Sequence, residues 1–322
     1  MHPVVKEELL RDDHLRRIER CCQVVSHTPA RRFEDLRSDV QVLITSWGCP
    51  RIDRDALVAL PGLKLIAHLA GSVKGFVDEA VWRTGIKITN AVAANAVPVA
   101  EYTLAAILFA NKQVLKLAAF YRDHHEHRAP WTREAPNVGN YRKVVGVVGA
   151  SHVGRKLLEL LKPFDFKVLL YDPYIAAVDC RKLGAQKVGL SELLSAADVV
   201  SLHVPLLTET RQMIGARELA LMKDGATLIN TARGAICDAA ALEAELVRGR
   251  LSAVLDTTDP EELPTDSPLF TLPNVLLTPH IAGSLGTETQ RLGDCIVEEV
   301  ERFCRGQALR YAVRHDELPR LA

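Results

Sequence analysis

One short stretch, the segment from Val144 to Asp172, constrains the fold of this chain more than any other. It opens with the apolar run VVGVVG and passes through the turn Gly149-Ala150-Ser151-His152-Val153-Gly154 into a helical pattern. It closes with a second apolar run, KVLLY, directly before Asp172. Short apolar runs bounded by glycine are typical of buried strands. The segment therefore predicts a strand, a tight turn, a helix and a second strand.

The turn has the spacing of a dinucleotide-binding loop, although Ser151 stands where a second glycine is usual. The amides of Ser151, His152 and Val153 at the helix start would attract a pyrophosphate, and the serine hydroxyl could add a hydrogen bond. Asp172 follows at about twenty residues, where an acid accepts hydrogen bonds from the adenosine ribose and repels the extra phosphate of NADP. The segment predicts NAD as the cofactor; the alternative is an ordinary turn with a capping serine.

Apolar runs alternate with helical patterns along the rest of the chain, which predicts an α/β protein with parallel sheets. The 322 residues are enough for roughly two domains. The expected strands are Val40–Thr45, Leu63–Leu69, Ile86–Thr89, Val199–Val204, Thr227–Asn230, Leu251–Asp256 and Val275–Thr278. The expected helices outside the turn unit are Val99–Ala119, Ala239–Arg248 and about Thr287–Arg305.

Composition narrows the class of protein. Lys and Arg together number 40, as do Asp and Glu, so the net charge is zero and no field gathers nucleic acid. The seven cysteines are scattered without a C-x-x-C pair, which indicates reduced thiols. The charged start of the chain does not resemble a signal peptide, and the apolar run Tyr102–Ala110 is too short to cross a bilayer. We expect a cytoplasmic protein that binds neither membrane nor nucleic acid, and no metal, because the histidines at 124, 125 and 127 lack accompanying ligands.

Three expected strands are followed by polar residues that carry chemistry. Arg233 follows the strand at 227–230, Glu261 lies in the segment after 251–256, and His280 follows 275–278. The carboxyl ends of parallel strands form the ligand crevice of an open α/β sheet. Arginine binds a carboxylate through two parallel hydrogen bonds, and histidine transfers a proton near neutral pH. The three residues together indicate acid–base chemistry on a small anionic molecule.

In these segments the sequence resembles the D-isomer-specific 2-hydroxyacid dehydrogenase family, and the resemblance covers nearly the whole chain. The matching pieces, in order, are Val99-Ala100-Glu101, the glycine turn, Tyr171-Asp172-Pro173, His203-Val204-Pro205-Leu206, Asn230–Gly234, Leu255-Asp256, Asn274-Val275 and Thr278–Gly283. The resemblance implies reversible hydride transfer between NAD and a 2-keto or 2-hydroxy acid. It also implies two domains with Rossmann or flavodoxin-like folds. Residues 97–282 would bind NAD, and residues 1–96 and 283–322 would together form a discontinuous substrate domain.

The resemblance also implies roles for single residues. Arg233 would bind the substrate carboxylate, His280 would be the general acid and base, and Glu261 would pair with His280. The cofactor residues would be Gly149, Ser151, His152, Val153, Gly154, Asp172, His203, Val204, Pro205, Thr231, Ala232, Asp256 and Gly283. Of these, Asp256 would hold the nicotinamide carboxamide. In the family these enzymes are homodimers, so we expect a homodimer here, with the apolar helix at 99–119 at the interface.

Two departures from the family pattern leave alternatives open. The sequence Asp259-Pro260-Glu261-Glu262 makes Glu262 a second candidate for the partner of His280. An early loop holds the expected substrate residues Gly71, Ser72 and Lys74, of which the lysine is unusual. Lys74 resembles a lysine of phosphite dehydrogenases and could bind a second negative charge, or it could be a solvated surface residue. A phosphite- or phosphonate-type dehydrogenase is therefore one alternative function, and an NAD(H)-sensing binding protein of the corepressor type is another.

Overall fold

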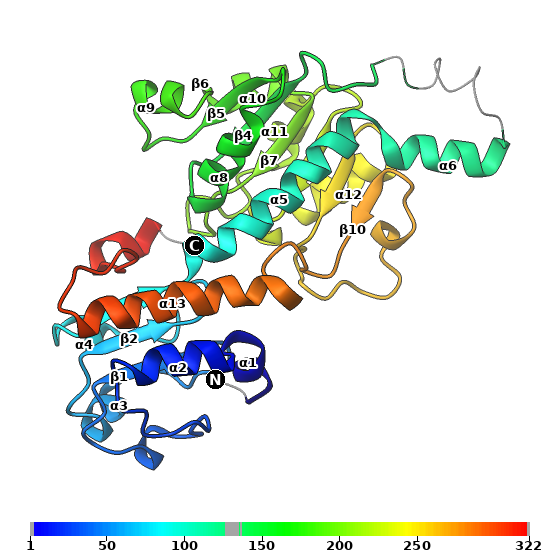
Figure 1. The fold of residues 1–322 in the computed structure, drawn as a ribbon. Helices are drawn as coiled ribbons and strands as arrows, with labels where there is room; N and C mark the ends of the chain where they lie inside the picture. The colour runs from blue at the N-terminus through cyan, green and yellow to red at the C-terminus, as the bar shows by residue number, and fades with distance from the viewer. Residues whose placement is uncertain (1–2, 126–134, 136, 321–322) are drawn as a thin grey trace. The chain divides into compact units, whose positions relative to one another are not determined.

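The computed structural model describes residues 3–125, 135 and 137–320 (Figure 1). The chain divides into two compact units, which we describe separately. Unit 1 combines Met1–Ala96 with Ser284–Ala322, and unit 2 is Val97–Gly283. The predicted division placed Gly283 with the substrate domain, whereas here this residue ends unit 2. The α/β class with parallel sheets is confirmed.

Unit 2 is built on seven parallel strands in the order β10-β9-β8-β7-β4-β5-β6. The strands are β4 (Val144–Val148), β5 (Lys167–Tyr171), β6 (Gln186–Lys187), β7 (Val199–Leu202), β8 (Thr227–Asn230), β9 (Ser252–Leu255) and β10 (Val275–Leu277). The strand order reverses direction between β4 and β7, as in dinucleotide-binding sheets. The loops after β4 and β7 therefore enclose the expected cofactor crevice.

Helices cover both faces of this sheet (Figure 1). They are α5 (Val92–Asn111), α8 (His152–Leu161), α9 (Ala177–Lys182), α10 (Leu190–Ala196), α11 (Ala216–Leu221) and α12 (Ala239–Val247), with 3-10 turns η2 (Gly234–Ile236) and η3 (Pro268–Phe270). A further helix, α6 (Val114–His124), follows α5 and has no buried residue. Val145 and Val147 of β4 belong to the core cluster formed with α5, α8 and α9, whereas Val148 belongs to the cluster formed with α10, α11 and α12. This alternation explains why the strands are apolar throughout, since both faces of the sheet are buried.

The helix predicted over Val99–Ala119 is wrong in its bounds. α5 begins at Val92, before Pro98, and ends at Asn111, and α6 follows after Gln113. Gln113 has a left-handed φ of 49°, and the Asn111 carbonyl accepts the amide of Gly139 at 2.9 Å instead of continuing the helix. A break of this kind depends on a distant segment of chain.

The full length of α5 also bears on the membrane question. At 20 residues, α5 is the one helix in the described parts of the chain that is long and apolar enough to cross a membrane, although the core helix of a soluble protein passes the same test. Ala100, Ala106 and Ile107 of this helix belong to the core of unit 2. The expectation drawn from Tyr102–Ala110 alone therefore considered too short a segment.

Unit 1 has a smaller sheet, in which β1 (Val42–Thr45), β2 (Leu65–His68) and β3 (Lys87–Asn90) are parallel and in that order. Its other elements are α1 (Pro3–Leu9), α2 (Asp12–Glu19), η1 (Phe33–Asp35), α3 (Arg54–Ala59), α4 (Glu79–Trp82), η4 (Gly286–Glu288), α13 (Thr289–Cys304) and η5 (His315–Arg320). Leu292, Ile296 and Val300 lie at helical spacing on α13 and are buried against α1, α2 and β2. The last long helix of the chain thus packs with its first helices in one core (Figure 1).

Candidate active site

The glycine turn joins β4 to α8 at the point where the strand order reverses. Gly149 has φ of +102°, which favours glycine. A Cβ on Gly154 would overlap the Gly149 carbonyl oxygen, so no larger residue fits there without backbone movement. The turn is therefore tight enough to present the amides at the α8 N-terminus to an anion.

Ser151 and Asp172 both bond to the backbone of this turn. Ser151 is the N-cap of α8, and its Oγ accepts the Gly154 amide at 3.3 Å. One carboxylate oxygen of Asp172 accepts the Ala150 amide at 2.7 Å, and the other accepts the amides of Tyr174 and Ile175. The capping role considered as the alternative for Ser151 is thus present, and it leaves the hydroxyl proton available to a phosphate. A carboxylate has about four acceptor sites, so Asp172 retains capacity for a ribose hydroxyl.

The segment after β7 forms the opposite wall of the turn. A Cβ on Gly149 would approach Val204 Cγ1 at 2.8 Å, so the two segments are in close contact. The His203 side chain is buried, its Nε2 lies 2.8 Å from Ser201 Oγ, and burial lowers its pKa to about 3. His203 is therefore neutral and supports the wall, while Pro205 continues the chain without an amide donor.

The loop after β8 carries Arg233 on a braced backbone. The side chain of Asn230 accepts the Ala232 amide at 3.1 Å and donates to the Arg233 carbonyl at 2.9 Å. A Cβ on Gly234 would overlap the backbone of Thr258, so the loops after β8 and β9 press together here. Arg233 itself is exposed, and its Nη1 donates to the Ala232 carbonyl at 2.6 Å.

Asp256, at the end of β9, holds the loop that follows β10. Its side chain is buried and accepts hydrogen bonds from Thr278 Oγ1 at 2.7 Å and from the amides of Ile281 and Ala282 at 2.8 and 2.9 Å. The His280 amide donates to the Asp256 carbonyl at 3.0 Å. The resemblance implied a contact between Asp256 and nicotinamide; in this structure its carboxylate shapes the loop that presents His280.

His280 and Glu261 meet across the β9 and β10 loops. His280 Nδ1 lies 2.6 Å from Glu261 Oε1, and both side chains are about half exposed. The loop before Glu261 is held by Thr258 Oγ1, which donates to the carbonyls of Pro260 and Glu261. Of the two carboxylates considered in the sequence, Glu261 is the one that contacts the ring. His280 has φ of 56°, a left-handed conformation that histidine adopts more readily than most residues and that the Asp256 contacts hold in place.

Sequence reasoning missed three residues that bind to these loops. Tyr102 Oη lies 2.8 Å from Thr278 Oγ1, and Thr103 Oγ1 lies 3.1 Å from Thr231 Oγ1, so α5 contacts the loops after β10 and β8. Arg155 Nε donates to the Ala150 carbonyl at 2.9 Å and adds positive charge beside the glycine turn. The sequence signal that could have indicated Tyr102 and Thr103 is that they are adjacent hydroxyl residues in a mostly apolar helix.

The expected substrate loop lies in unit 1, directly after β2. The Lys74 amide donates to Ser72 Oγ at 3.2 Å, and partial burial lowers the pKa of the Lys74 ammonium. Gly71 has open space where a Cβ would lie. His68, at the end of β2, is buried against Phe76 with its Nδ1 3.0 Å from Thr45 Oγ1, and burial lowers its pKa to about 4.

Comparison with known proteins establishes the family. The model described as "D-isomer specific 2-hydroxyacid dehydrogenase, NAD binding domain" matches residues 104–282, more than half of this chain. The chain therefore belongs to the D-isomer specific 2-hydroxyacid dehydrogenase family, and this stretch is its NAD-binding domain. The resemblance and the NAD prediction drawn from the sequence are both confirmed.

Among curated relatives, D-3-phosphoglycerate dehydrogenase of Methanocaldococcus jannaschii is 30% identical over 99% of this chain and 60% of its own length. Glyoxylate reductase of Aeropyrum pernix is 33% identical over 80% of this chain and 78% of its own length. The chain thus spans about half to 60% of the phosphoglycerate dehydrogenases it matches. Among solved structures, the TT0316 protein of Thermus thermophilus is 32% identical with a TM-score of 0.75, covering 94% of this chain and 97% of that one.

Proposed function

We propose that this protein is an NAD-dependent oxidoreductase that interconverts a 2-keto acid and a D-2-hydroxy acid. The observation that carries the proposal is the edge formed by β8, β9 and β10, three neighbouring parallel strands. Their loops carry Arg233, Glu261 and His280, with His280 Nδ1 and Glu261 Oε1 at 2.6 Å. A cation for a carboxylate and a carboxylate-oriented histidine are the groups that carbonyl reduction requires.

The residues around the glycine turn fit NAD. The tight turn at Gly149 and Gly154 lets the start of α8 approach a pyrophosphate, Ser151 can donate its hydroxyl proton, and Asp172 can accept from the ribose. When bound there as NADH, the cofactor supplies the hydride that goes to the carbonyl carbon. The negative charge of Asp172 favours NADH over NADPH.

The contacts of His280 favour one of its nitrogens for the proposed proton transfer. Since Glu261 engages Nδ1 of His280, Nε2 is the nitrogen left to donate a proton to the carbonyl oxygen of the substrate. Arg233 has five N–H donors, so it can bind the substrate carboxylate while keeping its bond to the Ala232 carbonyl. In the reverse direction the same Nε2 removes the hydroxyl proton.

The substrate class can be found with a spectrophotometric screen of NADH oxidation. The named relatives act on acids of different charge, so the panel should include 3-phosphohydroxypyruvate beside glyoxylate, hydroxypyruvate, pyruvate, and branched and aromatic keto acids. Phosphite with NAD tests the phosphite-type alternative that Lys74 suggested. Tight NADH binding without turnover on the whole panel would instead support the NAD(H)-sensing protein.

The variant His280→Asn tests the role of the histidine. Asparagine tolerates the left-handed conformation of residue 280, so the loop should keep its shape. Because general acid–base catalysis contributes about 10²–10⁴-fold, we expect kcat on the best keto acid to fall by that factor while the Kd for NADH stays within about twofold. Stopped-flow kinetics and NADH fluorescence titration measure the two quantities.

Arg233→Gln provides the comparison for this result. The arginine acts in both the ground state and the transition state, so KM should rise together with the fall in kcat. A turnover of His280→Asn equal to that of the parent protein would contradict the assigned role of His280.

A further inference from the structure

Three cysteines from opposite ends of the sequence meet in unit 1, away from the residues discussed so far. Cys21 and Cys22 follow α2, and Cys304 ends α13. Their sulfur atoms all lie within 4.8 Å of one another. Cys22 Sγ is 3.2 Å from Cys304 Sγ and 4.0 Å from Cys21 Sγ. The sequence showed no pair at metal-binding spacing, because about 280 residues separate the two halves of this thiol cluster.

The spacing of the three sulfurs suits a bound metal ion. Thiolates bind Zn²⁺ at about 2.3 Å, so three of them around a tetrahedral ion lie about 3.8 Å apart. The distances from Cys22 Sγ to Cys304 Sγ and to Cys21 Sγ, 3.2 and 4.0 Å, fall on either side of this value. Small side-chain rotations would bring the sulfurs into place, since Cys304 is exposed and Cys21 and Cys22 are half-buried.

Polar groups lie beside the cluster. Cys21 Sγ donates to the Ile18 carbonyl at 3.3 Å. A thiol that binds a metal ion releases its proton to solvent. Arg17 pairs with Glu301 at 3.0 Å beside the cluster, which limits the negative charge that the thiolates face.

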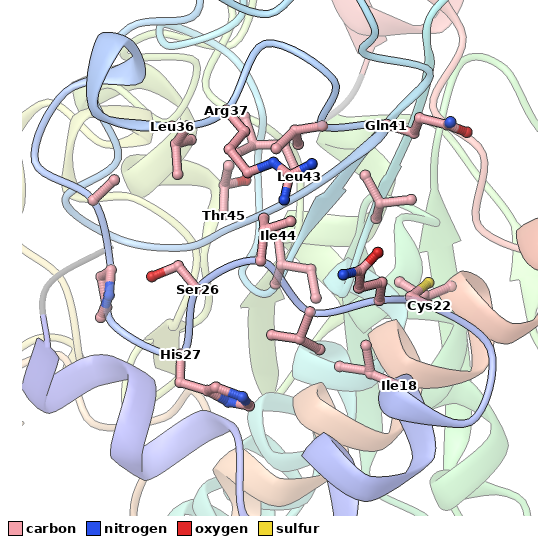
Figure 2. Close-up of a pocket in the computed structure, with 18 of the residues that line it drawn as sticks. Ile18, Cys22, Ser26, His27, Leu36, Arg37, Gln41, Leu43, Ile44 and Thr45 are labelled. Atoms are coloured by element: carbon pink, nitrogen blue, oxygen red, sulfur yellow. The ribbon is translucent and has the colours of Figure 1, made fainter.

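A cavity gives access to the cluster from solvent. Its volume is about 720 Å³, and Cys21, Cys22 and Cys304 are among its lining residues. Figure 2 shows Cys22 on its wall near Ile18. Cys304 is exposed, so an ion can reach the sulfurs without opening the core.

We propose that Cys21, Cys22 and Cys304 form a binding site for one thiophilic d¹⁰ cation, Zn²⁺ or Cu⁺, held by three thiolates. Soft sulfur ligands without imidazole or carboxylate select these ions over Mg²⁺, Ca²⁺ and Mn²⁺. The bound ion would link α2 to α13, and so join the two segments of chain that make up unit 1.

The test is a metal titration of the reduced, chelator-treated chain under anaerobic conditions. Co²⁺ serves as the optical probe for the Zn²⁺ arm, through its thiolate charge-transfer bands, followed by displacement with Zn²⁺. For Cu⁺, the affinity is measured by competition with a coloured Cu⁺ chelator. We expect one equivalent of one of these ions per chain, and affinity lower by at least about tenfold in Cys22→Ser and in Cys304→Ser.

Cys49→Ser is the matched control, since Cys49 lines the same cavity but lies outside the cluster. It should bind metal like the parent chain, and circular dichroism should show that all three variants are folded. Binding well below one equivalent in both arms, or equal binding by Cys304→Ser, would overturn the proposal. It would also be overturned if peptide mapping found a Cys22–Cys304 disulfide and the reduced chain bound neither ion.

Discussion

The sheet of unit 2 has seven parallel strands, whereas the sheet of unit 1 has three. In unit 2, nearly all the polar residues of the candidate site follow the carboxyl ends of five adjacent strands, β10, β9, β8, β7 and β4. In unit 1 the functional candidates are a loop after β2 and a thiol cluster made by helix ends. In the large sheet, the order of the strands brings the polar side chains of the site together. In the small, discontinuous unit, packing between distant segments of the chain does so.

The largest expected effect comes from replacing one glycine by alanine in each unit, because the two glycines differ in how tightly their surroundings are packed. Gly154→Ala places a methyl group against the Gly149 carbonyl, so the glycine turn must move. We expect the free energy of unfolding to fall by about 3 kcal/mol and NADH binding to weaken strongly. Gly71→Ala in the loop after β2 meets open space and should change stability by less than about 0.5 kcal/mol. Urea unfolding and NADH titration measure both; equal effects of the two substitutions would show that the glycine turn is not tightly packed.

A second test compares neighbouring carboxylates in unit 2. Glu261→Gln weakens the hydrogen bond to His280 Nδ1, and a hydrogen bond to a charged group contributes about 1.5–3 kcal/mol. We therefore expect kcat/KM to fall roughly 10- to 150-fold. The matched variant Glu262→Gln should keep the parent rate, because Glu261 is the carboxylate that contacts the ring. Steady-state kinetics with the best keto acid decides, and a larger loss in Glu262→Gln would reverse the assignment.

The smallest expected effect concerns stability in acid, for which each unit has a buried histidine whose pKa is lowered by burial. The pKa is lowered to about 3 at His203 in unit 2 and to about 4 at His68 in unit 1. Since the unfolded chain takes up these protons near pH 6.5, stability is complete above that pH and is lost as the pH falls toward the folded-state values. The slope is at most about 1.4 kcal/mol per pH unit for each histidine.

Variants separate the two contributions. His203→Gln and His68→Gln should each reduce the dependence of the unfolding free energy on pH between 6.5 and the folded-state values. The effect of His203 should extend to lower pH, because its folded-state pKa is the lower of the two. Urea unfolding over this range provides the measurement, and an unchanged slope in His203→Gln would contradict a neutral His203 in the fold.

Local patterns in the sequence predicted local structure well. The segment from Val144 to Tyr171 folds as predicted to within one residue, because strand, turn and helix depend on neighbouring residues. The loops after β8, β9 and β10 were also placed correctly from their apolar strands. Counting from Asp256 favoured Glu261 and left Glu262 as a second candidate; in the structure Glu261 contacts His280, in a loop held by the Thr258 side chain.

Features that depend on distant contacts were not predictable in the same way. The end of α5 depends on the amide of Gly139, and the buried bonds of Asp256 depend on the loop after β10. The thiol cluster combines cysteines from both ends of the chain, and their spacing in sequence contains no signal for it.

The shared core of unit 1 also determines when this protein can finish folding. During synthesis, all of unit 2 leaves the ribosome before α13 does, so the nucleotide-binding sheet can form while unit 1 is incomplete. Until then, Leu65 and Ala67 of β2 lack their partners Leu292 and Ile296. The nascent chain therefore exposes an apolar surface for the whole time needed to translate unit 2, a period in which chaperones can bind it.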